Sequence, residues 1–168
     1  MQDLEFKVVK NDNREYVLQC LEIFRENHVN NGGMLKNTLA VLMSDYIVCA
    51  LKEGEVVGYL VLVEDNYKDN DIFFEQLAVK KSFQHQGIGT ALVEYVKKHS
   101  LNYSYITSNV RGDNDASNNL HLKMGFEQSR RGNYDYTYIL PTEQISNRLP
   151  LELTEEDEIE LEWKWIQK

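Results

Sequence analysis

Gln84, Gly87 and Gly89 form the segment of this chain whose residue types are best suited to binding a ligand. They lie between an apolar, β-prone run at 72–79 and an amphipathic run of helical period at 90–98. Glycine lets the backbone approach a ligand closely because it has no Cβ. A loop that leads into a helix also presents unpaired N–H groups and a partial positive charge. The pattern predicts a seat for a phosphate group, and a tight turn without a ligand is the alternative.

Two other phosphate motifs fit the same segment less well. A P-loop requires Lys and then Ser or Thr after its second glycine, whereas Thr90 and Ala91 stand there. A dinucleotide-binding fingerprint requires a third glycine, whereas Leu92 occupies that place. The segment therefore favours neither of these two classes of nucleotide-binding site.

Glu75 is a candidate for proton transfer. Glu75 stands in an apolar strand, and strict alternation puts it on the same face as Leu77 and Val79. Partial burial there would raise the pKa of its carboxyl toward the range of a general base, and an ion pair with a neighbouring Lys or Arg is the alternative.

The elements that must position these residues alternate between strands and helices. Apolar alternation and turn residues predict strands at 4–10, 46–51, 56–63, 72–79, 103–110, 127–131 and 135–140. Helical periodicity predicts helices at 16–27, 34–43, 90–98 and 116–124. This order of elements is typical of an α/β (α+β) fold in which a mixed sheet carries helices on its faces.

Length and charge narrow the classes of function. The chain has 168 residues, a net charge of −9 and a hydrophobic content of 42%, which fits one domain with a sizeable core. The negative charge argues against nucleic acid as a partner. No segment reaches the roughly 20 apolar residues of a membrane span, and the first ten residues lack an apolar signal-peptide core. We therefore expect a cytoplasmic protein with neither a nucleic-acid nor a membrane partner.

Residues 141–168 form an acidic C-terminal extension, which we expect not to be an independent domain beyond the main domain at 1–140. The extension holds eight acids and three bases. Thr154 and Asp157 resemble a helix start, but the alternation that ends in Trp163 and Trp165 favours a strand. Such a strand could pair with another part of the fold or with a second subunit, so a homodimer is one expectation.

Taken together, these pieces resemble the GNAT superfamily of acyl-CoA-dependent N-acyltransferases. The matching stretches are EQLAV at 75–79, QHQGIG at 84–89, Asn114, and MGF at 124–126. The family's pyrophosphate signature, Gln/Arg-x-x-Gly-x-Gly/Ala, is satisfied at 84–89. The resemblance covers roughly residues 4–140, is strongest over 72–126 and leaves the tail uncovered. It implies a mixed, mostly antiparallel central sheet whose middle strands splay apart to hold the cofactor.

The resemblance also implies the reaction and its residues. Acetyl-CoA would be the co-substrate, an amine would attack its thioester directly, and no metal would take part. Glu75 would be the general base, while His121 stands where the family often has a tyrosine as general acid. With an ordinary pKa of about 6.5, His121 could donate a proton as a cation. The alternative for His121 is a hydrogen-bonded histidine on a short helix. The implied cofactor contacts are Leu77, Ala78, Val79, Gln84, His85, Gln86, Gly87, Ile88, Gly89, Thr90 and Asn114. The alternative for Asn114 is a helix cap.

Five strand tyrosines are alternatives for the acid, although packing is the commoner role of such residues. They are Tyr103, Tyr105, Tyr134, Tyr136 and Tyr138.

We therefore expect an N-acetyltransferase that moves an acetyl group from acetyl-CoA to a primary amine of a small molecule or peptide. Glu64, Asp65, Asp69 and Asp71 crowd the loop before the central strand, which favours a cationic acceptor, although ordinary loop solvation explains them equally well. The alternative is a non-catalytic acyl-CoA-binding regulatory module that kept the cofactor seat and lost the acid.

Overall fold

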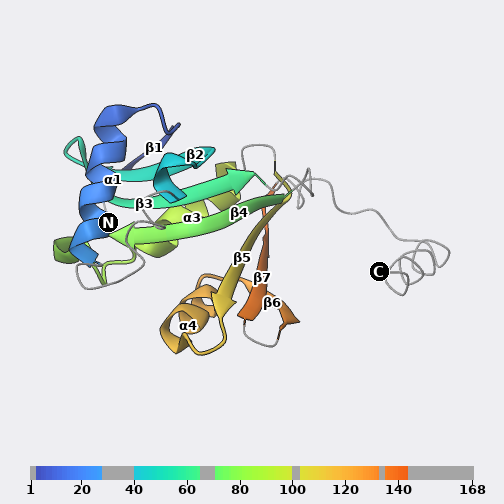
Figure 1. Cartoon of the computed structure of the whole chain (residues 1–168). Helices are drawn as coiled ribbons and strands as arrows, with labels where there is room; N and C mark the ends of the chain where they lie inside the picture. The colour runs from blue at the N-terminus through green and yellow to red at the C-terminus, as the bar shows by residue number, and fades with distance from the viewer. Residues whose placement is uncertain (1–2, 28–39, 65–70, 100–102, 133–134, 144–168) are drawn as a thin grey trace.

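The computed structural model of the chain describes residues 3–27, 40–64, 71–99, 103–132 and 135–143 (Figure 1). In these residues the elements are β1 (Glu5–Val9), α1 (Arg14–Asn27), β2 (Tyr46–Lys52), β3 (Glu55–Glu64), β4 (Asp71–Val79), η1 (Lys81–Phe83), α3 (Ile88–His99), β5 (Tyr105–Arg111), α4 (Asp115–Lys123), β6 (Glu127–Arg131) and β7 (Asp135–Pro141).

The described strands form one seven-stranded sheet in the order β1-β2-β3-β4-β5-β7-β6. Every neighbouring pair is antiparallel except β4 and β5, which run parallel. A parallel pair needs a crossover connection, and α3 supplies it. The predicted mixed, mostly antiparallel sheet with flanking helices is therefore confirmed.

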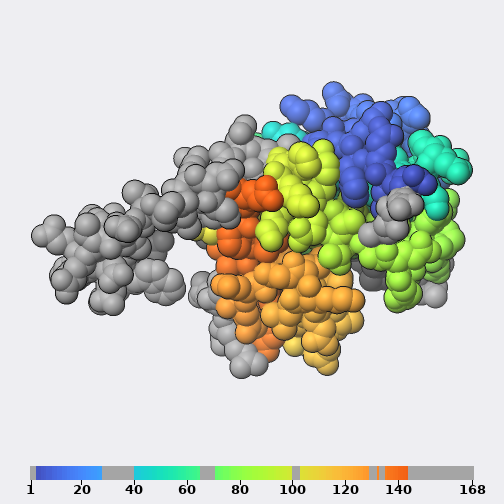
Figure 2. All heavy atoms as spheres, turned by 180° about the vertical axis from the view of Figure 1, so that it is seen from behind, coloured from blue at the N-terminus to red at the C-terminus, as the bar shows by residue number. Residues whose placement is uncertain are grey.

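Helices cover both faces of the sheet, which is why β2 and β3 are almost continuously apolar. Neighbouring residues of one strand separate the two layers: Val48 packs with Leu92 and Val96 of α3, whereas Cys49 packs with Cys20 of α1. Figure 2 shows α3 in yellow-green on the rear face, between the blue N-terminal residues and the orange C-terminal strands. The helical spacing of the buried residues thus fixes which face each helix covers.

The start of α3 lies close to the sheet because β3 contains Gly58. A Cβ on Gly58 would stand 2.9 Å from Cγ2 of Ile88 and 3.4 Å from the carbonyl oxygen of Ala78. Real Cβ atoms essentially never come within 3.0 Å of such an atom. Gly58 therefore lets the first residue of α3 rest against the middle of the sheet.

The middle of the sheet divides after a short junction. The parallel pairing joins Asp71–Phe73 to Tyr105–Thr107, and beyond it β4 and β5 diverge (Figure 1). The far half of the sheet, with β5, β7, β6 and α4, therefore swings away from β4. This is the splaying that the family resemblance implied.

Some predicted elements fall wholly or partly outside the described residues. Only residues 40–43 of the predicted helix at 34–43 are described, and none of 144–168, so the tail strand and the homodimer stay predictions. In the part of the chain that is described, no helix is both long enough and apolar enough to cross a bilayer.

Candidate active site

The loop between β4 and α3 brings a helix start to the end of β4. His85 and Gly87 take φ angles of 62° and 83°, a left-handed region that glycine adopts easily. The N–H of Ala91 donates to the carbonyl of Gly87 at 2.9 Å, so the helical hydrogen bonds begin there. The N–H groups at 88–90 precede any acceptor within the helix. Together with the helix dipole, they make this end of α3 suited to an anion.

Gln84 ties the loop to two other elements. Its Nε2 donates to Oδ1 of Asn27 in α1 at 2.6 Å and to the carbonyl of Val79 at 3.0 Å. Nδ2 of Asn27 donates to the same Val79 carbonyl at 3.0 Å. The side chain of Gln84 therefore anchors the loop, and a contact of this residue with a phosphate stays a prediction.

Gly89 lets the first turn of α3 approach β4. A Cβ at this position would lie 3.3 Å from Cδ2 of Leu77, which is tighter than most real contacts. Leu77 and Val79 are half-buried on the α3 side of the sheet, whereas Ala78 is buried on the α1 side. From Phe74 onward β4 is no longer paired with β5 in the described residues. The edge of β4 that β5 no longer covers thus runs toward the helix start, and at its end Asn27 and Gln84 bind the Val79 carbonyl.

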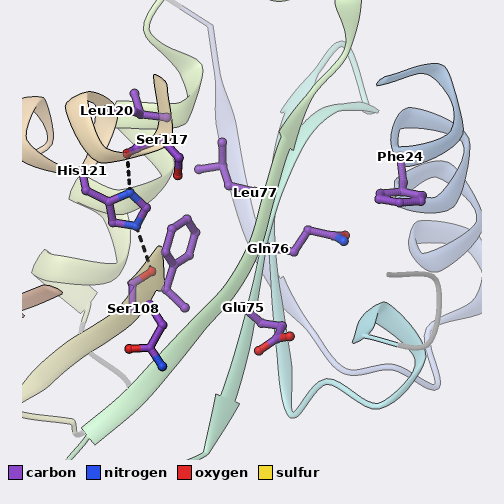
Figure 3. A pocket seen from close by; sticks show the side chains of 10 residues that line it. Phe24, Glu75, Gln76, Leu77, Ser108, Ser117, Leu120 and His121 are labelled. Atoms are coloured by element: carbon purple, nitrogen blue, oxygen red, sulfur yellow. Dashed lines mark hydrogen bonds between the residues drawn. The ribbon is translucent and has the colours of Figure 1, made fainter. Parts of the chain in front are cut away.

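Glu75 is the residue at which the pairing of β4 with β3 shifts. Val61 faces Gln76 and Leu62 faces Phe74, so Glu75 is the extra residue of a β-bulge. The predicted alternation and partial burial of Glu75 are wrong: Phe74 and Leu77 share the α3-side core, while Glu75 is exposed. Figure 3 shows the Glu75 carboxylate pointing away from Leu77.

His121 is hydrogen-bonded at both ring nitrogens. Nδ1 lies 2.8 Å from the carbonyl oxygen of Ser117, one turn earlier in α4. Nε2 lies 2.8 Å from Oγ of Ser108 in β5, and both contacts are drawn in Figure 3. A carbonyl only accepts, so Nδ1 carries the hydrogen and Nε2 of the neutral ring accepts from the Ser108 hydroxyl. The network fixes one tautomer of the imidazole.

The surroundings of His121 favour its neutral form. The side chain is buried, and burial lowers the pKa of the imidazole below 6.5 against a smaller opposing effect of the Ser117 carbonyl. The rings of Phe74, Phe126 and Tyr138 lie 5.0 to 5.4 Å from it between centroids. The predicted role as a proton-donating cation rested on an ordinary pKa, which this site does not provide.

Tyr138 was one of the alternatives for the acid, and it contacts His121 without facing a ligand. Its hydroxyl donates to Oδ1 of Asn118 at 2.7 Å in a buried position. Asn118 in turn donates to the carbonyls of Arg111 and Asn114 at 2.9 Å each. This network holds α4 against β5 and β7, so Tyr138 positions the helix that carries His121.

Asn114 caps α4. Its Oδ1 accepts from the N–H of Ser117 at 3.1 Å, and the side chain is exposed. The helix-cap alternative is confirmed, and a contact with a cofactor stays a prediction.

A pocket of about 250 Å³ lies where β4 and β5 diverge. We call it the central pocket. It is lined by Phe24 of α1, the β4 residues 74–77, Ser108 and Asn109 of β5, and Ser117, Leu120 and His121 of α4. Figure 3 shows Leu77 and His121 pointing into the space between β4 and α4, whereas Gln76 points toward α1.

The chain matches the model of the Acetyltransferase (GNAT) family over residues 17–126. The match spans more than half of the sequence. The chain belongs to the GNAT acetyltransferase family.

Solved GNAT structures have the same fold. The ribosomal-protein-S18-alanine N-acetyltransferase of Escherichia coli has a TM-score of 0.62 at 17% identity, over 82% of this chain and 94% of that one. A GNAT-family acetyltransferase of Bacillus cereus has a TM-score of 0.63 at 15% identity, over 82% and 98%. Tetrahymena GCN5 has a TM-score of 0.66 at 19% identity, over 82% and 96%. A comparison with curated proteins found no significant match.

Within this GNAT fold, the predicted residues fall into two groups. Glu75, Leu77 and His121 line the central pocket, while the loop at 84–90 lies at the end of β4. Sequence reasoning missed Ser108 and Ser117. Ser108 stands in a strand where a serine is unremarkable, and its importance appears only when α4 places His121 beside it.

Proposed function

We propose that this GNAT acetyltransferase moves an acetyl group from acetyl-CoA to a primary amine of a small molecule or peptide. One observation carries the proposal: β4 and β5 part after Phe73, and a helix start lies at the end of the β4 edge that β5 no longer covers. Such an edge suits an extended amide-bearing chain, as in strand addition. The helix start suits a phosphate. The proposed acceptor is an amine because Glu75 and the Ser108–His121 pair, which can take up protons, line the pocket beside that edge.

The described residues fit acetyl-CoA as co-substrate. The N–H groups at 86–90 would hold the pyrophosphate, because Gly87 and Gly89 leave room for close approach. Backbone groups of Leu77 and the N–H of Val79 would pair with the pantetheine arm, because the Val79 carbonyl already accepts from Asn27 and Gln84. When bound, acetyl-CoA supplies the acetyl thioester that the amine attacks.

Glu75 is the proposed general base. An amine reaches the enzyme mainly as an ammonium ion at neutral pH, and only the neutral form attacks. The exposed Glu75 carboxylate attracts the cation and takes its first proton, directly or through water. Because Glu75 is exposed at the bulge, it can pass that proton to solvent.

The competing function is a non-catalytic acyl-CoA-binding module, and the neutral, fully hydrogen-bonded His121 is the observation that favours it. The test measures thiol release from acetyl-CoA with a panel of primary amines, beside calorimetric titration of CoA into the full chain. Thiol release that depends on an amine supports the enzyme. CoA binding without turnover for any amine supports the module, and absence of CoA binding overturns both.

A further inference from the structure

We propose that Ser108 and His121 form a proton relay that carries a proton from the attacking amine nitrogen to the leaving sulfur. The inference rests on the proposed N-acetyltransferase function. It makes Ser108 a catalytic residue and His121 the group that stores the proton. We call this pair the Ser108–His121 relay.

The direction of the two hydrogen bonds carries the inference. The Ser117 carbonyl holds the hydrogen of His121 on Nδ1 at 2.8 Å, which leaves the Nε2 lone pair toward Ser108. The Ser108 hydroxyl donates into that lone pair, so its own oxygen lone pairs are free to accept. Ser108 lines the central pocket. A hydroxyl of a pocket-lining residue that donates to a fixed imidazole is arranged to accept a proton while giving one up.

The groups packed around His121 keep it neutral and ready to accept. Phe74 faces it from β4, Ser108 from β5, Tyr138 from β7, and Phe126 from the turn after α4. Tyr138 is titratable, but its hydroxyl donates to Asn118. Burial lowers the pKa of His121, so the imidazole is unprotonated at neutral pH. Across the same pocket stands the carboxylate of Glu75.

Acetylation of an ammonium ion involves two protons with different destinations. The first leaves before attack and is released to solvent, which suits the exposed Glu75. The second leaves the nitrogen as the amide forms, and its transfer to the departing sulfur suits a pair that is almost fully buried in the pocket wall. Ser108 and His121 are both buried. The two sites thus divide the two protons between them.

The step balances without any further reactant. The amine nitrogen bonds to the carbonyl carbon, and the carbon–sulfur bond breaks with its electron pair on sulfur. The nitrogen's proton passes to Oγ of Ser108 as the hydroxyl's own proton passes to Nε2 of His121. The imidazolium then returns a proton through Ser108 to the thiolate. His121 and Ser108 end as they began, and one proton has moved from nitrogen to sulfur.

The test compares Ser108→Ala with the wild-type chain in the amine-dependent thiol-release assay. We expect kcat to fall about 100-fold, the usual size of lost acid–base catalysis, with CoA affinity unchanged. Ser108→Thr, which keeps the hydroxyl, is expected to recover most of kcat. Ser44→Ala is the matched control, because it deletes another buried hydroxyl that does not line the pocket. The Ser44 hydroxyl donates to the Val41 carbonyl at 2.7 Å. Thermal unfolding of each variant reports on folding.

A pH profile separates chemistry from structure. In the wild type, kcat at saturating amine is expected to fall on an acid limb below pH 6.5, because protonated His121 cannot accept. Ser108→Ala is expected to lose that limb, because His121 no longer communicates with the substrate. An unchanged acid limb in Ser108→Ala would contradict the relay. The pH profile remains informative even if the variant is less stable than the wild type, because a constant loss of folded protein scales the profile without changing its shape.

The remaining outcomes are distinguishable. A wild-type chain that acetylates no amine defeats the proposed function itself. A wild-type chain that turns over while Ser108→Ala keeps the full kcat defeats the relay alone. Acetylated protein, detected by intact mass after mixing with acetyl-CoA alone and absent from Ser108→Ala, would overturn the relay in favour of a covalent acyl-serine.

Discussion

The two walls of the central pocket present different kinds of chemical group. The β4 wall is a strand edge that β5 no longer covers, with the exposed Glu75 on its bulge. It runs toward the start of α3, and its proposed binding groups are backbone N–H and C=O. The β5–α4 wall is buried and acts through side chains, Ser108 and His121. The contrast teaches that the proposed binding depends on local chain geometry, whereas the proposed chemistry depends on packing between distant segments.

The largest effect on the contrast between the two walls is expected from Thr90→Glu. This change alters the helix start at the end of the β4 wall and leaves the β5–α4 wall as it is. A carboxylate in the first turn of α3 suits the helix dipole but repels a phosphate. At about 5 Å and an effective dielectric constant of about 20 the repulsion is roughly 3 kcal/mol, so CoA should bind about 100-fold more weakly. Calorimetric titration of CoA measures the change.

The matched control for that variant is Thr90→Gln, which has nearly the same shape without the charge. It should bind CoA more tightly than Thr90→Glu does. Equal affinities of the two variants for CoA would show that no anion rests at this helix start.

Gly58→Ala tests how the start of α3 is held against the sheet. The added Cβ would lie 2.9 Å from Cγ2 of Ile88, so the helix or the strand must shift. Overpacking of this kind costs about 2 kcal/mol in the free energy of unfolding. Chemical denaturation measures it, and Gly54→Ala serves as a contrast because nothing lies within 4 Å of its added Cβ, which leaves only the strain of a φ of 81°.

Glu75→Gln tests whether the exposed carboxylate handles the first proton. We expect kcat/KM for a cationic amine to fall about tenfold near pH 7, less than the usual roughly 100-fold or more of acid–base catalysis, because solvent can replace an exposed base. The deficit should shrink at high pH, where the amine is already neutral. Stability should change by less than about 0.5 kcal/mol, because the side chain is exposed. A deficit that stays constant with pH would contradict the role.

The smallest expected effect is a pH dependence of stability that belongs to the β5–α4 wall. The folded pKa of His121 lies below its unfolded value of 6.5, so the unfolded chain binds more protons between the two. The contribution is complete above pH 6.5 and is lost as the pH falls through the folded pKa. Denaturation curves of the wild type and of His121→Phe, compared from pH 7 downward, should converge toward acid. Parallel curves would contradict the lowered pKa.

The β4 wall could be predicted from the sequence because its signals are local. The two glycines, the helical period of Leu92 and Val96 and the β-prone run before them lie within one stretch of chain. Each follows from the conformations that these residues favour. The same locality explains why the sheet, its helices and the family resemblance were all predictable.

The β5–α4 wall was only half predictable. His121 was found by its place in a family motif, but its neutral state depends on rings from β4, from β7 and from the turn after α4. Ser108 carries no local signal at all. The bulge at Glu75 was also missed, because no glycine marks it and strict alternation fits the sequence equally well.

The three residue pairs that join β4 to β5 have a mechanical consequence. In the described sheet, that short ladder is the only backbone pairing between the half formed by β1 to β4 and the half formed by β5, β7 and β6. Loss of that ladder together with the packing of Phe74 against His121 and Phe126 would let β5, α4, β6 and β7 tilt as one unit about Phe73. Amides of β5, β6 and β7 would then exchange with deuterium together and earlier than those of β2 and β3. The same hinge would limit the size of the acceptor that the pocket admits.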